Sequence, residues 1–136
     1  MKKLNRYWIA ALIMSMLLIL QCTSNNNKSL NLKLTKMAEN LNLSSPTVLD
    51  QHTRFDSAIV TPENIFQYYY TIIYANNPSE LLSNQKKELI NNMKKAFTTD
   101  RSLQVFKDNK VTIQYIYKDT AQNIIDIITI DSEAYN

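Results

Sequence analysis

Apolar residues recur along this chain with two periods, and each period predicts a different kind of element. Steps of three and four residues are typical of one face of a helix, and alternation with a period of two is typical of a strand. The predicted helices cover residues 30–43 and 77–97, with a further short helix capped by Thr99. The predicted strands cover residues 53–60, 65–74, 111–117 and 124–130.

This order, α-β-β-α-α-β-β, predicts a single α+β domain. We expect one four-stranded antiparallel sheet made of two hairpins, with the helices packed on one face. In the first hairpin, Phe55, Ser57 and Ile59 are expected on one face of their strand. In the second strand the apolar face is rich in tyrosine and is expected to lie under the helices; it comprises Phe66, Tyr68, Tyr70, Ile72 and Tyr74.

The N-terminus has the pattern of an export signal. Lys2, Lys3 and Arg6 precede a run that is apolar over residues 7–20 apart from Ser15. The run is shorter than the roughly 20 apolar residues that span a bilayer, which favours a cleaved signal over an uncleaved membrane anchor. We therefore expect residues 1–21 to be a signal peptide.

The chain's one cysteine, Cys22, stands where the apolar run ends, in the sequence Ile-Leu-Gln-Cys. This sequence resembles a bacterial lipobox, which implies that Cys22 carries the lipid (diacylglycerol and palmitate) at the start of the mature chain. Residues 22–29 then form the lipidated cysteine and a polar tether, and residues 30–136 form the domain. The alternatives are ordinary cleavage after Ser24, giving a periplasmic or secreted protein, and an incidental Cys22 within the signal.

The amino-acid composition excludes several classes of binding site. The chain has no glycine, which excludes the phosphate-binding and dinucleotide-binding loops that require it. It has one histidine and one cysteine, so an ordinary zinc site is not expected, and no metal or cofactor is predicted. Of the 15 basic residues three belong to the signal, which leaves 12 against 12 acidic residues. A mature chain without net charge argues against nucleic acid as a partner.

The densest polar cluster lies in and just before the first predicted strand. A small envelope hydrolase would use His52 as general base with Asp56 or Ser57, but alternation places His52 and Ser57 on opposite faces of a strand. Structural pairing of Arg54 with Asp56 is favoured instead. Arg54, Asp56 and Tyr69 are therefore interpreted as a partner-binding surface, and no catalytic residue is predicted.

Three segments together are similar to a group of short exported bacterial proteins. They are Asp50–Ser57 in a D-x-x-T-R-x-D-S pattern, Tyr68–Thr71 in a Y-x-Y-T pattern, and Tyr115–Tyr117 in a Y-x-Y pattern. The resemblance implies an exported α+β domain and no particular activity. The sequence as a whole predicts a non-enzymatic lipoprotein of the cell envelope, on the periplasmic or surface side, that binds another envelope protein as an assembly or inhibitor module.

Overall fold

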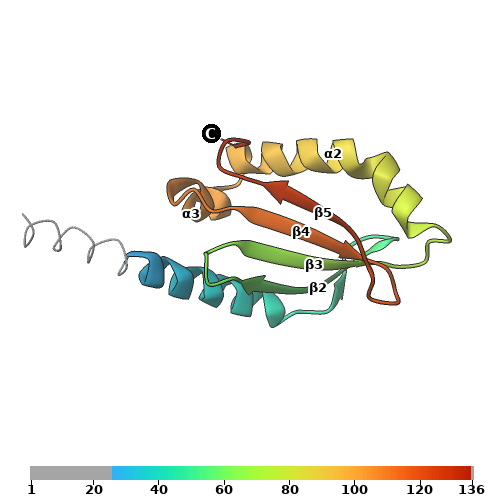
Figure 1. The fold of residues 1–136 in the computed structure, drawn as a ribbon, viewed down its shortest axis with the longest axis horizontal. Coiled ribbons are helices and arrows are strands. Elements are labelled where there is room, and N and C mark those ends of the chain that lie inside the picture. Colours follow the sequence, from blue (N-terminus) through green and yellow to red (C-terminus); the bar gives the residue numbers. More distant parts are fainter. Residues whose placement is uncertain (1–25, 136) are drawn as a thin grey trace, which may run out of the picture.

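The computed structural model describes residues 26–135, so the expected signal peptide, Cys22 and Ser24 lie outside the described residues. The N-terminal helix covers residues 26–42 and is followed by a five-stranded sheet with two further helices and a 3-10 turn (Figure 1). The strands are β1 (Thr47–Val48), β2 (Thr53–Val60), β3 (Phe66–Ile72), β4 (Ile113–Lys118) and β5 (Ile124–Ile130). The other helical elements are α2 (Pro78–Thr99), η1 (Arg101–Leu103) and α3 (Gln104–Asp108).

The sheet has the order β1-β2-β3-β4-β5, and it is mixed. The two expected hairpins, β2–β3 and β4–β5, are confirmed as antiparallel pairs. The expectation of an entirely antiparallel, four-stranded sheet is wrong, because β3 and β4 pair in parallel and β1 adds a short edge strand. The cause is the long connection: α2 carries the chain back to the end of the sheet where β3 began, so β4 starts there and runs the same way.

A β-bulge in β2 changes which residues face the core. Phe55 pairs with Tyr70 and Ser57 with Tyr69, so that Asp56 is the extra residue. After the bulge Ala58, which is 1% exposed, faces the core in place of Ser57. The predicted face of Phe55, Ser57 and Ile59 is therefore wrong, since strict alternation fails at the extra residue.

Two asparagines attach the N-terminal helix to the sheet. The Asn42 side chain donates to the carbonyl of Ala58 (2.8 Å) and accepts from its N–H (2.7 Å), so it continues the pairing of β2 where β1 stops. Asn31 donates to the carbonyl of Thr61 and to Oδ1 of Asn64, both at 2.9 Å. Residues 26–29, which were expected in the tether, already belong to this helix.

The cap of α2 is the one that the sequence predicts. Asn77 accepts a hydrogen bond from the N–H of Glu80, and Pro78 occupies the first turn. At the other end Asp100, not Thr99, caps the next turn by accepting from the N–H of Ser102. Over its 22 residues α2 buries just Leu82 and Phe97, so its contact with the sheet is concentrated near its two ends.

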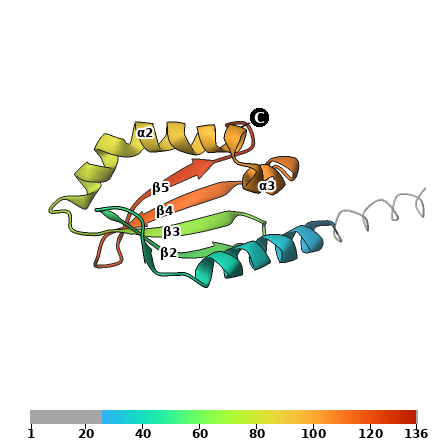
Figure 2. The same ribbon diagram turned by 180° about the vertical axis from the view of Figure 1, so that it is seen from behind.

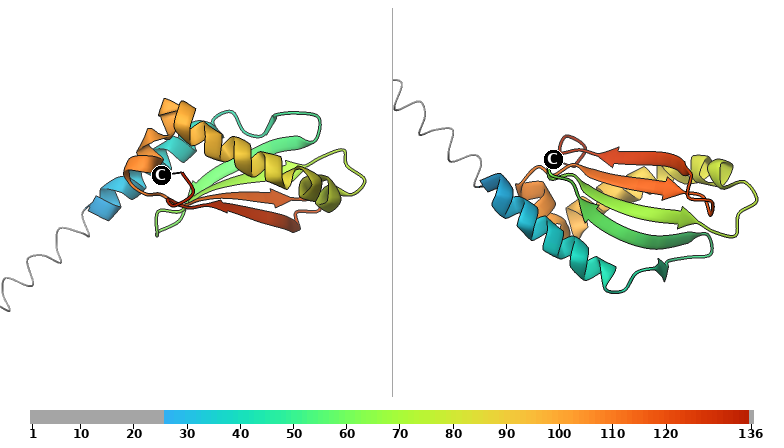
Figure 3. Two further views of the ribbon diagram at one scale, coloured as in Figure 1. Left: turned by 90° about the horizontal axis from the view of Figure 1, so that it is seen from above. Right: turned by 60° about the horizontal axis from the view of Figure 1, so that its bottom comes forward.

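The core lies between the sheet and the helices, on one face of the sheet. In Figure 2 the N-terminal helix lies alongside β2 and α2 lies alongside β5, with β3 and β4 between them. Figure 3 shows the sheet nearly edge-on, with α2 and α3 on one side. The largest side chains that are almost completely buried are Phe66, Phe97, Phe106, Leu34, Ile113 and Ile130. The opposite face of the sheet carries no helix among the described residues, and we call it the open face.

Candidate functional site

Four tyrosines of β3 and β4 form a two-by-two array on the helix-bearing face. The parallel register places Tyr68 beside Tyr115 and Tyr70 beside Tyr117. Within each pair the ring centroids are 5.3 Å apart, and the ring planes differ by 13° and 22°. We call Tyr68, Tyr70, Tyr115 and Tyr117 the tyrosine cluster.

The cluster is largely buried: Tyr117 is only 4% exposed, and the other three tyrosines are half-buried. Burial raises the pKa of Tyr115 to about 12, and burial with the neighbouring Tyr115 raises the pKa of Tyr117 to about 12. The pKa values of Tyr68 and Tyr70 also lie well above that of a free phenol, chiefly because of burial. Within residues 26–135 no fully buried side-chain oxygen or nitrogen lacks a partner, and the four hydroxyls make no hydrogen bond within this range, so each keeps some contact with solvent.

An open pocket of about 350 Å³ lies over one end of the cluster. We call it the Tyr68 pocket; it is lined by Met37, Asn40, Leu41, Ser44, Tyr68, Ser102, Leu103 and Phe106. Its walls are the end of the N-terminal helix and the η1–α3 segment, and Tyr68 provides the floor. Leu41 is 39% exposed at its rim. A concave, largely apolar surface with a tyrosine floor is typical of a site that accepts a side chain of a partner.

The helix α2 extends this apolar surface along the β5 edge of the same face. Leu89, Ile90 and Met93 from its middle turns are partly buried against the core, although only residues near its ends are fully buried. The helix-bearing face therefore keeps partly exposed apolar side chains on both of its long sides. We call the Tyr68 pocket and the tyrosine cluster together the tyrosine groove.

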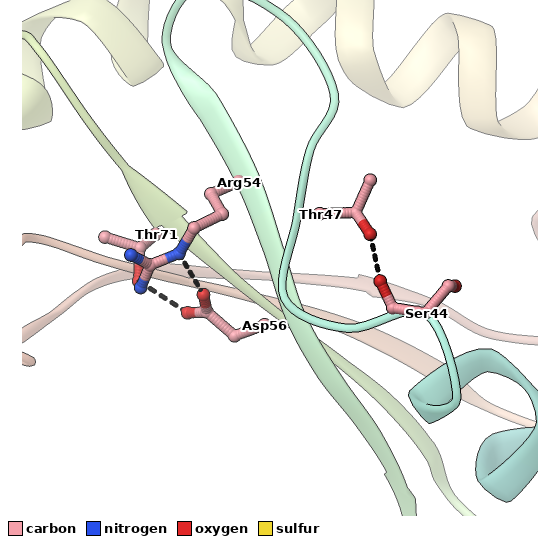
Figure 4. Close-up of polar contacts among 5 residues, drawn as sticks. All are labelled: Ser44, Thr47, Arg54, Asp56 and Thr71. Atoms are coloured by element: carbon pink, nitrogen blue, oxygen red, sulfur yellow. Dashed lines mark hydrogen bonds and ion pairs between the residues drawn. The ribbon is translucent and has the colours of Figure 1, made fainter.

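The predicted partner-binding residues Arg54 and Asp56 lie on the open face, and Figure 4 shows them with Thr71. The guanidinium Nε of Arg54 donates to Asp56 Oδ1 at 2.6 Å, and the second carboxylate oxygen accepts from the Thr71 hydroxyl at 2.5 Å. The same close-up shows Thr47 donating to the carbonyl of Ser44. Thr71 is 1% exposed, so Asp56 satisfies a buried hydroxyl as well as a cation.

This network predicts a measurable coupling. Replacing Asp56 by alanine leaves the Thr71 hydroxyl without its acceptor, and we expect a loss of about 1–3 kcal/mol in the free energy of unfolding. Adding Thr71→Val removes that hydroxyl. The double variant is therefore expected to lose less free energy of unfolding than the two single variants lose together. Urea unfolding of the four proteins measures the coupling. Asp108→Ala, at an exposed residue of α3, is the control, and its stability is expected to stay within about 0.5 kcal/mol of the parent. Additive losses would contradict the prediction.

Tyr69, the third predicted binding residue, also lies on the open face but is partly covered. The Lys118 ammonium lies 4.8 Å from its ring centroid, and its hydroxyl donates to Gln67 at 3.1 Å. Beneath them Ile116 is only 3% exposed. The structure thus brings Arg54, Asp56 and Tyr69 onto one face, where each is already held by a neighbour.

The residues of the hydrolase alternative are not brought together. The His52 ring nitrogen Nδ1 lies 3.2 Å from the Ile73 carbonyl, in an open pocket of about 320 Å³ whose lining includes neither Asp56 nor Ser57. Asp50 accepts hydrogen bonds from the backbone N–H groups of His52 and Thr53, not from the imidazole. A general base and its nucleophile must lie within hydrogen-bond reach, so this arrangement does not support the chemistry.

Comparison with family models gives a match over residues 29–127, which include the tyrosine cluster and Arg54, Asp56 and Tyr69. The chain belongs to the DUF8479 family. The family is described as a domain of unknown function. Among curated proteins no significant match to this sequence is found.

Solved structures share the fold of this DUF8479 domain. A protein from Pseudomonas aeruginosa that is described as secreted matches with a TM-score of 0.70 and 9% identity, over 81% of this chain and 96% of its own. The type 2 secretion system pilotin EpsS from Vibrio vulnificus matches with a TM-score of 0.61 and 13% identity, over 83% and 97%. The type II secretion system pilotin AspS from Vibrio cholerae gives 0.61 and 12%, over 82% and 97%. At these identities the likeness establishes the fold alone.

The part of the DUF8479 domain that sequence reasoning missed is the Tyr68 pocket. Its walls come from residues far apart in the chain, such as Leu41 and Leu103. In the sequence each of these two leucines is indistinguishable from an ordinary apolar residue of a helix. Over residues 26–135, no group of three or more His, Cys, Asp or Glu side chains is placed to hold a metal ion. None of the helices in this range is long and apolar enough to cross a membrane.

Proposed function

We propose that this DUF8479 protein is exported, is attached to a membrane of the bacterial cell envelope through a lipid on Cys22, and works by binding another envelope protein. The N-terminal pattern supports export, since a basic start and a short apolar run end at the cysteine. The fold is shared with a protein described as secreted and with two pilotins of type II secretion systems. A role in assembling an envelope complex is therefore the function we favour, with an inhibitor role as the alternative.

The observation that carries the proposal is the tyrosine groove. Tyrosine is enriched at protein interfaces because its ring is apolar and its hydroxyl can still bond when a partner covers it. The groove offers a pocket of about 350 Å³, large enough for one apolar anchor, next to four hydroxyls that make no hydrogen bond among the described residues. Interfaces draw most of their affinity from a few such buried anchors.

The open face is the second candidate surface, and the sequence favoured it. Its best-placed groups are Arg54, Asp56 and Tyr69, but the first two neutralise each other and Tyr69 is partly covered by Lys118. A partner binding there would have to displace these contacts, whereas the four hydroxyls of the groove have no hydrogen-bond partner within residues 26–135. We therefore place the partner in the groove.

Photocrosslinking separates the two surfaces with a matched pair of positions. Leu41 at the groove and Ile127 on the open face are apolar and similarly exposed, at 39% and 44%. A photoreactive amino acid at position 41 is expected to give a discrete adduct with an envelope protein in intact cells, and one at position 127 is not. Adducts from position 127 alone would move the site to the open face, and adducts from neither position would contradict the binding function.

The lipid anchor is tested separately. Mass spectrometry of the membrane form is expected to find diacylglycerol and an acyl chain on an N-terminal Cys22, and Cys22→Ser is expected to move the protein out of the membrane fraction. A mature chain that begins at Asn25 would establish cleavage after Ser24 instead. Retention of the intact Met1 end would contradict both forms of processing.

A further inference from the structure

The tyrosine groove carries a charge pattern that the chain as a whole lacks. Acidic and basic residues balance outside the N-terminal six residues. Yet no lysine or arginine is among the described residues that line the Tyr68 pocket or the open pocket of about 320 Å³ that contains His52. The charged side chain that lines either of them is an acid, Glu80. The two pockets therefore have no basic side chain among the described residues of their lining.

Carboxylates stand at both ends of the tyrosine cluster. Asp100 lies beside the Tyr68 pocket, where it accepts from the N–H of the lining residue Ser102 at 2.8 Å. Asp50 lies at the other end, before β2, and accepts from the N–H groups of His52 and Thr53 at 2.8 Å. The strand register places Asp50 at this end, since Thr53 pairs with Ile72, two residues beyond Tyr70. After burial and the neighbouring tyrosines, Asp100 also helps to raise the pKa of Tyr68, and Asp50 that of Tyr117.

These two carboxylates form no ion pair among residues 26–135, in contrast to Asp126. Asp126 also faces the cluster, but the Lys86 ammonium of α2 lies 2.6 Å from its Oδ2. Asp50 and Asp100 make hydrogen bonds to backbone N–H groups and form no ion pair within residues 26–135. Each keeps a negative charge that a cation of a partner can meet, and the exposed Asp100 is held ionised because its hydrogen bonds with Ser102 lower its pKa.

We infer that the occupant of the tyrosine groove is a segment of the partner protein with apolar residues at its centre and lysine or arginine on both flanks. The apolar centre would fill the Tyr68 pocket, and the two basic flanks would lie over Asp50 and Asp100. Complementary charges of this kind contribute more to the specificity for a partner than to the total affinity. The same carboxylates disfavour nucleic acid and anionic lipid in the groove. The inference rests on the proposed function and adds the chemistry of the partner to it.

Two synthetic amphipathic peptides with the same leucine and isoleucine stripe test the inference, one with lysine and the other with glutamate at both ends. Fluorescence anisotropy of the labelled peptides with the folded domain measures both affinities at low salt. The lysine peptide is expected to bind about threefold to thirtyfold more tightly, the range that two exposed ion pairs give. High salt is expected to remove most of that difference.

Charge-neutral variants assign the preference to the two carboxylates. Asn keeps the acceptor oxygen that caps each turn, so Asp50→Asn with Asp100→Asn removes the charge and preserves the local hydrogen bonds. The double variant is expected to lose the preference for lysine. Asp119→Asn is the control, because Asp119 is a carboxylate that likewise caps a turn, that of the β4–β5 loop, by accepting from the N–H of Asn123, and it is expected to leave the preference unchanged.

The outcomes separate this inference from the proposed function. Equal affinities for the two peptides, or a preference that survives in the double variant, would overturn the charge assignment while leaving the groove as a binding site. Binding of neither peptide would also overturn it, and the crosslink from position 41 would then decide the proposed function alone. Self-association of the domain that blocks peptide binding would make a second copy the occupant and would overturn the inference as well.

Discussion

Replacing Phe97 by alanine is expected to lower the free energy of unfolding by about 3–5 kcal/mol, the usual cost of removing a buried aromatic ring. Phe97 is 2% exposed and stacks on Tyr135, with ring centroids 4.3 Å apart and planes at 10°. It is one of two buried residues in α2, so the C-terminal half of this helix depends on it for attachment to the domain. The loss is a large part of the 5–15 kcal/mol that stabilises a typical domain.

Thermal and urea unfolding measure this effect, with Met93→Ala as the control on the same helix. Met93 is only partly buried against the core, so its truncation is expected to cost clearly less than that of Phe97. A fall in Tm of more than about 10 °C is expected for Phe97→Ala. Equal losses for the two variants would show that α2 is held evenly along its length, which would contradict a special anchoring role of Phe97.

Local signals in the sequence predicted most of the elements correctly. The Asn77-Pro78 start of α2, the strand over residues 124–130 and the left-handed Asn64 with φ 65° all follow from capping, alternation and turn chemistry, which act within a few residues. Tyr74 was predicted on the apolar face of the second strand, and this prediction is wrong. The strand β3 ends at Ile72, so Tyr74 lies beyond it, 84% exposed and with φ 53°.

The features that the sequence did not predict depend on contacts between distant residues. Both β-hairpins are local, but the parallel pairing of β3 with β4 depends on how α2 packs against β5, and single-sequence patterns do not contain that information. The bulge at Asp56 is likewise a matter of register with β3. The same holds for the candidate site: the tyrosines were expected in the core, but the pocket above Tyr68 exists only once the N-terminal helix and α3 stand on either side of it.

Raising the pH above about 10 is expected to destabilise the domain steeply, because the tyrosine cluster keeps its protons in the folded state. In the unfolded chain a tyrosine ionises near pH 10, whereas burial raises the pKa of Tyr115 and Tyr117 to about 12 and shifts Tyr68 and Tyr70 in the same direction. Between these values the unfolded state binds fewer protons than the folded state, so the free energy of unfolding falls as pH rises. The stabilisation is complete below pH 10 and is lost as pH rises through the folded pKa values.

The slope identifies the groups responsible. Each tyrosine that stays protonated only in the folded state contributes about 1.4 kcal/mol per pH unit, so the four together give a slope of up to about 5 kcal/mol per unit. Urea unfolding at a series of pH values from about 8 to about 11.5 measures it over the range where the two states differ. Tyr115→Phe with Tyr117→Phe is expected to halve the slope, and Tyr74→Phe, at a ring that is 84% exposed, is expected to leave it unchanged. A free energy of unfolding that does not change with pH over this range would mean that the four tyrosines ionise as freely in the folded domain as in the unfolded chain. The floor of the groove would then be a hydrated surface, and the apolar surface on which partner docking depends would be absent.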